Sequence, residues 1–129
     1  MFRKLGLAMG IAASLAFVSA PVSAADGAKL FKRCKACHTL TGKNKVGPTL
    51  KGVFGRKCGT ITSFKYGKGY KMACKQTPFV IDEAFLMEYL INPSKKLTKM
   101  VGQKVRSKMN FKLKKKDQRA AIVAYLKSQ

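Results

Sequence analysis

The feature that most constrains this chain is the segment Cys34-Lys35-Ala36-Cys37-His38. Two thiols three residues apart can each add across a vinyl group of haem, while the adjacent histidine turns its imidazole toward the iron. A thioredoxin-like dithiol belongs in a βαβ pattern that is absent here, and zinc needs all four cysteines or a cysteine–histidine set at finger spacing. The segment therefore predicts one haem c, covalently bound through Cys34 and Cys37, with His38 as an iron ligand.

Length and charge limit what can surround this segment. The chain has 129 residues, with 27 Lys plus Arg against 5 Asp plus Glu, a formal net charge of +22 and 47% hydrophobic residues. This length fits one small domain, and the hydrophobic content argues against a disordered polycation. Because the chain has a single histidine, a haem held by two histidines is excluded.

Residues 1–24 have the pattern of a secretory signal peptide. Two basic residues precede an apolar run over 5–18, which is shorter than the roughly 20 residues that span a bilayer. Small side chains favour cleavage after Ala24, and an uncleaved membrane anchor is the alternative. Residues 25–129 would then form the mature domain, with 25 basic and 5 acidic residues and a charge of +20, in the oxidising periplasm.

The residue pattern predicts an all-α domain with long loops. Helices are expected over 26–35, 83–91 and 117–127, because each begins near an Asp and carries apolar side chains toward one side. Residues 39–70 contain eight Gly or Pro and are expected to be mostly loop. Three short helices make a thin core, so a protein of this size normally needs a cofactor, a metal or a disulfide.

The iron also needs a sixth ligand or an open position. Without a second histidine, the candidates are a methionine thioether or a lysine amine. Met87 lies within a predicted helix, where core packing is the simpler role, and Met72 lies beside Cys74 in a stretch expected to be constrained otherwise. Met100 and Met109 remain as candidates from the residues alone.

Five segments stand in a characteristic order along the chain: Cys34 to His38, Val46 to Lys57 with its Gly-Pro, Leu86 to Leu90 with Asn92-Pro93, Ser107 to Met109 with Phe111, and Ala124 to Lys127. Together they resemble class I cytochrome c, the small carriers of mitochondria and bacterial periplasms. The resemblance implies the cytochrome c fold, with three main short helices and long loops wrapped around one covalently bound haem c. In that family the ligand methionine precedes an aromatic residue by two positions, which implies Met109, with Met100 in an insertion.

The resemblance also implies roles around the haem. The carbonyl of Pro48 should accept a hydrogen bond from the ring N–H of His38, and the Tyr89 hydroxyl should donate toward the Met109 sulfur. Terminal helices should cross where Leu30 or Phe31 meets Ile122 and Tyr125. Arg56 and Tyr66 are also expected to contact a haem propionate. Ser107 and Phe111 are expected near the haem on its methionine side.

The sequence departs from the family pattern at Ile81, where the family usually has a tryptophan that binds a propionate. The chain has no tryptophan, so the propionate must lose that donor or find another. Cys58 and Cys74 are outside the haem motif, and the resemblance implies that the ends of their loop approach each other. A disulfide closing about 15 residues is expected there, stabilising by about 3 kcal/mol in the chain-entropy model, and two free buried thiols are the alternative.

A haem iron closed by His and Met carries electrons rather than binding oxygen, so the expected function is a periplasmic one-electron carrier and not an enzyme. A c-type haem enzyme or gas sensor with a displaceable sixth ligand is the main alternative, and a secreted basic binding module is a further one. Expected partners are acidic surfaces of a quinol-oxidising cytochrome complex, an oxidase or reaction centre, or a periplasmic dehydrogenase, with an anionic membrane surface also possible and nucleic acid not expected. The chain is expected to be a monomer. The expected steering residues are Arg33, Lys45, Lys95, Lys96, Lys108 and Lys114 to Lys116.

Overall fold

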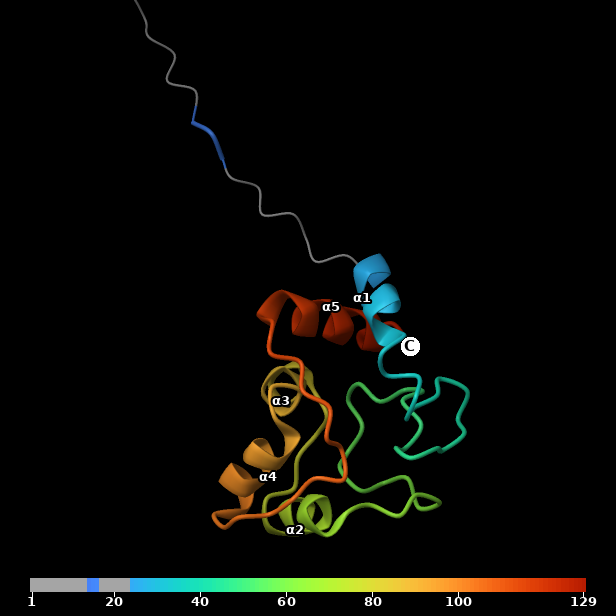
Figure 1. The fold of residues 1–129 in the computed structure, drawn as a ribbon, viewed down its shortest axis with the longest axis vertical. Helices are drawn as coiled ribbons and strands as arrows, with labels where there is room; N and C mark the ends of the chain where they lie inside the picture. Colours follow the sequence, from blue (N-terminus) through green and yellow to red (C-terminus); the bar gives the residue numbers. More distant parts are fainter. Residues whose placement is uncertain (1–13, 17–23) are drawn as a thin grey trace, which may run out of the picture.

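The structure is a computed structural model that describes residues 14–16 and 24–129. Within these ranges the chain is helical, as expected, with one isolated bridge between Lys57 and Val80. In Figure 1, α1 and α5 lie together at the top, α3 and α4 on the left, and α2 at the bottom, with the loops after α1 on the right. The helices are α1 (Ala24–Phe31), α2 (Lys68–Gln76), α3 (Glu83–Tyr89), α4 (Pro93–Val101) and α5 (Lys116–Lys127).

The predicted signal segment lies almost entirely outside the described residues. Cleavage after Ala24 therefore stays a prediction. Within the described ranges, no helix has the length and apolarity needed to cross a bilayer.

Two helices were missed by the sequence prediction, which gave three. α2 has no side-chain cap at Gly67 and contains Gly69, so no capping residue marked its start and an internal glycine weakened its helical pattern. α4 did have a signal, because the Asn92 side chain accepts from Lys95 N at 3.1 Å and Pro93 occupies the first turn. Pro93 disfavours a helical residue before it, and it also begins the next helix.

The predicted helix ends were also partly wrong. α1 ends at Phe31 rather than at residue 35, because the chain turns there and Cys34 N donates to Phe31 O at 2.8 Å. α3 ends at Tyr89 rather than at residue 91, and α5 begins at Lys116. The turn after α1 places the two haem-motif cysteines outside regular helix, where both side chains can lie on one side of a turn.

The core forms where α1 crosses α5 (Figure 1). Phe31 is 1% exposed and its ring lies 5.3 Å from that of Tyr125, which confirms the expected crossing. The helices approach so closely at Gly27 that a Cβ there would collide with the Ala121 carbonyl. Leucines and valines of α3 and α5 extend this core toward the loops, so the terminal helices form a fixed wall for the rest of the domain.

The predicted disulfide between Cys58 and Cys74 is present. It joins the residue after the Lys57 bridge to the second turn of α2 and closes a separation of 16 residues. The loop therefore has a covalent base, while its interior is held by stacked rings, with Tyr66 and Tyr70 parallel at 5.0 Å.

Candidate haem site

The haem motif forms a tight turn directly after α1. Both Cys37 N and His38 N donate to Cys34 O, at 3.1 and 2.9 Å. Both thiols are free; Cys34 is half-buried and Cys37 exposed. Burial raises the pKa of the Cys34 thiol. The turn thus presents two unpaired sulfur atoms and one imidazole from five consecutive residues.

The imidazole of His38 is held in place by a hydrogen bond at its Nδ1 atom. Its Nδ1 lies 2.8 Å from the carbonyl oxygen of Pro48, so the expected hydrogen bond is present. Burial lowers the pKa of His38, which keeps the ring neutral. A neutral ring that donates through Nδ1 has its lone pair on Nε2, the atom then available to a metal.

Gly47 makes this arrangement possible, because a Cβ there would overlap the His38 ring, at 2.7 Å from Nδ1. We expect Gly47→Ala to displace the ring or the Pro48 strand and to lower the free energy of unfolding by about 1–3 kcal/mol. Chemical denaturation of the ferric holoprotein measures this. Val46→Ala, at an adjacent exposed position, should change stability by less than about 0.5 kcal/mol. Equal stability of the two variants would contradict the close packing.

The segment that carries Met109 is held by serine hydroxyls. Met109 N donates to Ser107 Oγ at 3.0 Å, and Ser107 N donates to Ser94 Oγ of α4 at 2.9 Å. Met109 itself is half-buried and packs against the core. The backbone that leads into Met109 is therefore anchored to α4.

Tyr89 pairs with the serine that holds Met109. Its hydroxyl lies 3.1 Å from Ser107 Oγ, and either hydroxyl can be the donor of this hydrogen bond. Donation from Tyr89 to the Met109 sulfur stays a prediction. Burial raises the pKa of Tyr89, so the hydroxyl stays protonated. Tyr89 thus supports Met109 through Ser107.

Met100, the other methionine candidate, lies in the last turn of α4. The sequence prediction placed it in an insertion. It is half-buried and packs against the hydrophobic core, which is a sufficient structural role.

The two halves of the site meet at one contact that the sequence did not reveal. The guanidinium of Arg33, next to Cys34, lies over the ring of Phe111, 5.0 Å from its centroid. Phe111 follows Met109 by two residues. The methionine segment is therefore brought beside the haem motif, although 75 residues separate Cys34 from Met109. No local pattern could have indicated this cation–π pair.

The predicted propionate residues have protein partners in the structure. The Arg56 guanidinium donates to the carbonyls of Thr49 and Lys51, at 2.8 and 2.6 Å. The Tyr66 hydroxyl accepts from Ile61 N at 3.1 Å. Ile81 is buried and bonds to Arg56 only through its backbone, so its side chain supplies no donor where the family has tryptophan. Propionate contacts of Arg56 and Tyr66 stay predictions.

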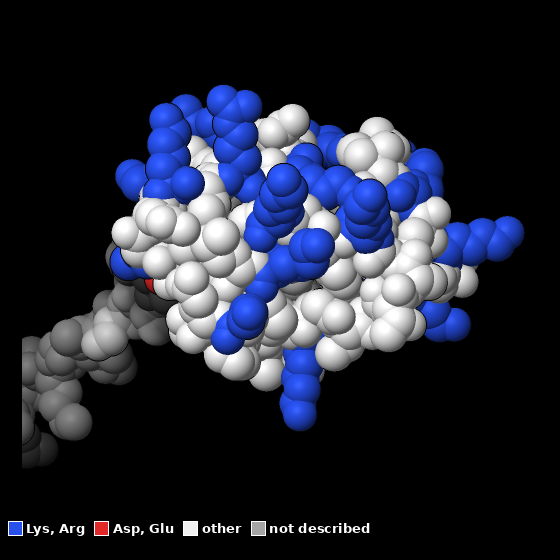
Figure 2. Space-filling view, turned by 90° about the horizontal axis from the view of Figure 1, so that it is seen from below, with Lys and Arg blue, Asp and Glu red and all other residues white. Residues whose placement is uncertain are grey.

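Positively charged side chains far outnumber negatively charged ones. The five acidic residues lie at the first turns of α1 and α5 and in or next to α3, and none lies between residues 27 and 81 or between 89 and 116. Figure 2 views the molecule from the side of α2, and this face carries blue side chains with hardly any red. Among the described residues one ion pair forms, Lys96 to Glu88 at 2.6 Å. The charge of Lys96 is therefore partly neutralised by Glu88, and its part in steering stays a prediction.

Comparison with known proteins agrees with this combination of fold and motif. The solved structure of ferricytochrome c2 from Rhodopseudomonas palustris superposes with a TM-score of 0.74 and 37% identity, covering 81% of this chain and 96% of that one. A cytochrome c2 of Cereibacter sphaeroides is 39% identical over 90% of each chain, and one of Rhodospirillum rubrum is 39% identical over 98% of each. These likenesses define the class as small helical proteins that attach haem.

The chain belongs to the cytochrome c family, whose sequence pattern matches residues 24–78. Members of this family bind one iron-containing haem c covalently through cysteines, and this protein does the same. The matched region contains the haem motif, Pro48 and both disulfide cysteines, while the full-length relatives also cover the segment of Met109.

Proposed function

We propose that the protein is a periplasmic one-electron carrier in which Cys34 and Cys37 hold haem c, and His38 and Met109 supply the two axial ligands. The observation that carries the proposal is that both candidate ligand residues are held by hydrogen bonds. His38 is fixed by the Pro48 carbonyl at 2.8 Å, and Met109 by Ser107 at 3.0 Å. A site with both axial positions filled by protein suits electron transfer rather than substrate binding.

The residues present fit the cofactor. The motif offers two free thiols, which thioether formation requires, and a neutral imidazole whose Nε2 is free of protein partners. Gly47 leaves the space in which the imidazole lies. When bound, the haem supplies an iron that gains or loses one electron.

The protein holds the His38 imidazole and the segment of Met109 in fixed positions. The Pro48 carbonyl orients the imidazole and makes it a better electron donor to the metal. Ser107, bonded to Tyr89 and to the Met109 backbone, keeps the thioether segment against α4. Thioether ligation raises the reduction potential, and groups that stay in place in both oxidation states keep reorganisation small.

The proposed partners are acidic surfaces of membrane electron-transfer complexes or of a periplasmic dehydrogenase. Exposed Arg33, Lys95 and Lys114 have no acidic partner among the described residues, so their charge is available for steering. Such encounters should weaken as salt is added. An anionic membrane surface is a second place where the same charge would act, and the carrier itself is proposed to be monomeric. Delivery to the periplasm would follow removal of residues 1–24.

Binding of carbon monoxide distinguishes an electron carrier from a haem enzyme or gas sensor. With both axial positions filled, we expect the visible spectrum of the ferrous holoprotein to be unchanged by carbon monoxide at neutral pH. The measurement is a titration of the reduced protein with dissolved gas. Rapid, stoichiometric binding would favour an open or displaceable sixth position and contradict the proposed function.

A further inference from the structure

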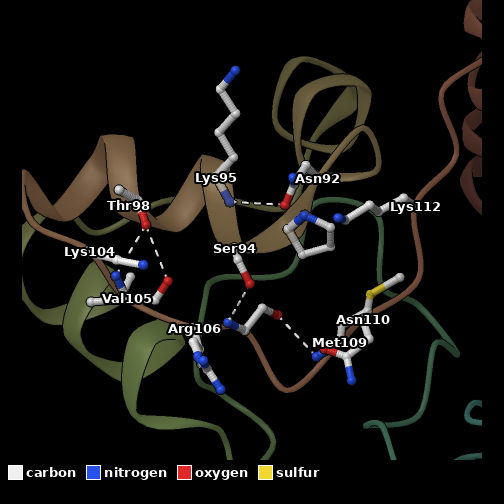
Figure 3. Close-up of a pocket in the computed structure, with 12 residues that line it drawn as sticks. Asn92, Ser94, Lys95, Thr98, Lys104, Val105, Arg106, Met109, Asn110 and Lys112 are labelled. Atoms are coloured by element: carbon white, nitrogen blue, oxygen red, sulfur yellow. Dashed lines mark hydrogen bonds between the residues drawn. The ribbon is translucent and has the colours of Figure 1, made fainter.

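A hollow lies between α4 and the loop segment 104–112, on the side of Met109 that faces α4 (Figure 3). Its volume is about 530 Å³, within the range of small-ligand sites and with room for more than a single phosphate group. The hollow adjoins the proposed methionine ligand, but the residues that line it come from α4, its cap and the loop, and not from the haem motif.

The lining carries positive charge only. Lys95, Lys104, Arg106 and Lys112 line it, and no acidic residue does. The side chains of these four residues form no ion pair or hydrogen bond with any described residue. By contrast, nearby Lys96 is paired with Glu88. Lys104, Arg106 and Lys112 therefore bring positive charge to the hollow that no described carboxylate neutralises, and this charge would attract an anion.

Hydrogen bonds to α4 hold the loop backbone around the hollow in place, whereas the charged side chains of the lining form none with the described residues. Ser94 Oγ accepts from Ser107 N at 2.9 Å, and Thr98 Oγ1 both accepts from and donates to the backbone of Val105, at 3.1 and 3.2 Å. These bonds tie the loop to α4 on two turns. Figure 3 shows the Lys112 side chain reaching across toward Asn92, with Lys104 on the opposite side and Lys95 pointing away from the hollow.

The available polar groups are mainly donors. Asn92 Oδ1 already accepts from Lys95 N, so its amide NH₂ is what remains. Lysine ammonium and arginine guanidinium groups only donate. A ligand with many acceptor oxygens and several negative charges therefore matches the site, and guanidinium binds such oxyanions in a bidentate manner.

We propose that this hollow binds a polyvalent phosphate of about the size of a diphosphate, free or at the end of a phosphorylated small molecule. Such a ligand would contact α4 and the loop together. It would therefore hold the segment of Met109 against the helix and stabilise the folded state as its concentration rises. The proposal depends on the lining of the hollow, and binding needs no electron transfer, so failure of the carrier function would leave it untouched.

Calorimetric titration of pyrophosphate into the ferric holoprotein at physiological ionic strength tests the proposal. We expect one saturable site in the wild type, and binding weakened by at least about tenfold in Lys104→Gln/Lys112→Gln, because two charge-assisted contacts are lost. The matched control is Lys71→Gln/Lys75→Gln, which removes the same charge from exposed positions on α2 that do not line this hollow. The control should bind within about twofold of the wild type, since its loss of general attraction is screened.

Equal weakening in both variants, or binding that never saturates, would overturn the proposal, because diffuse attraction to the net charge would then explain it. All four lysines are exposed, so both variants should fold, and unchanged visible spectra would verify this.

A second experiment adds phosphatidylglycerol vesicles to the complex of the protein with pyrophosphate. Retention of pyrophosphate would support a soluble phosphate as the ligand, and displacement would overturn it in favour of an anionic membrane surface.

Discussion

Met109→Leu is expected to lose the ferric far-red absorption band of an iron–thioether bond completely, while the haem stays covalently attached. Leucine fills a similar volume but has no sulfur lone pair. The hydrogen bond from the backbone N–H of residue 109 to Ser107 Oγ should be kept, because the side chain of residue 109 takes no part in it. The sixth position then opens, so the ferrous variant should bind carbon monoxide, and its reduction potential should fall, because thioether ligation is what raises it. Visible spectroscopy with and without the gas measures both changes.

Met100→Leu is the matched control for that experiment. Met100 is half-buried in the last turn of α4 and packs against the core, where leucine is a tolerated replacement. We expect this variant to keep the far-red band and to resist carbon monoxide. A band lost in Met100→Leu and kept in Met109→Leu would reverse the ligand assignment. A band absent from the wild type would indicate a lysine ligand or an open position.

Removing the disulfide with Cys58→Ser/Cys74→Ser is expected to lower the free energy of unfolding by about 3 kcal/mol, because the bond closes a loop of about 15 residues in the unfolded chain. That is a large share of the stability of a small domain. Denaturant unfolding of the ferric holoprotein measures the loss.

A second pair of substitutions separates chain entropy from the burial of a hydroxyl. Cys58 is buried, so a serine there adds a cost that alanine does not. Cys58→Ala/Cys74→Ala should still lose most of the 3 kcal/mol. If both double variants unfold at the wild-type denaturant concentration, the disulfide does not stabilise the fold, and alkylation of two free thiols in the native protein would argue that it does not form.

Local patterns predicted the haem motif and three of the helices. Cys34, Cys37 and His38 are contiguous, so their chemistry can be stated without a fold. The helix over 83–89 was indicated by Asp82, whose side chain accepts from Phe85 N at 2.8 Å. Helix α2 was missed partly because it contains Gly69. This glycine packs so closely against the Arg106 carbonyl that a Cβ there would collide with it. Its glycine is required by tertiary packing, which weakens the helical signal in the sequence.

Long-range pairings were predicted only where a family resemblance supplied them. The Pro48 to His38 bond and the Cys58 to Cys74 disulfide were expected on that basis and are present. The resemblance did not indicate that the Tyr89 hydroxyl also pairs with Ser107 Oγ, which joins it to the segment of Met109. The contact between Arg33 and Phe111, and the basic hollow beside α4, depend on how distant segments pack, and no residue spacing indicates either.

The central claim is that a haem is joined to this chain through Cys34 and Cys37. Mass spectrometry of the unfolded protein, purified from the periplasm of a host that attaches c-type haem, tests it most directly. We expect the mass of residues 25–129 plus one haem, and a proteolytic fragment in which residues 34–38 carry the haem and neither cysteine reacts with an alkylating reagent. A chain without added haem mass, with both of these thiols alkylated, would contradict the account.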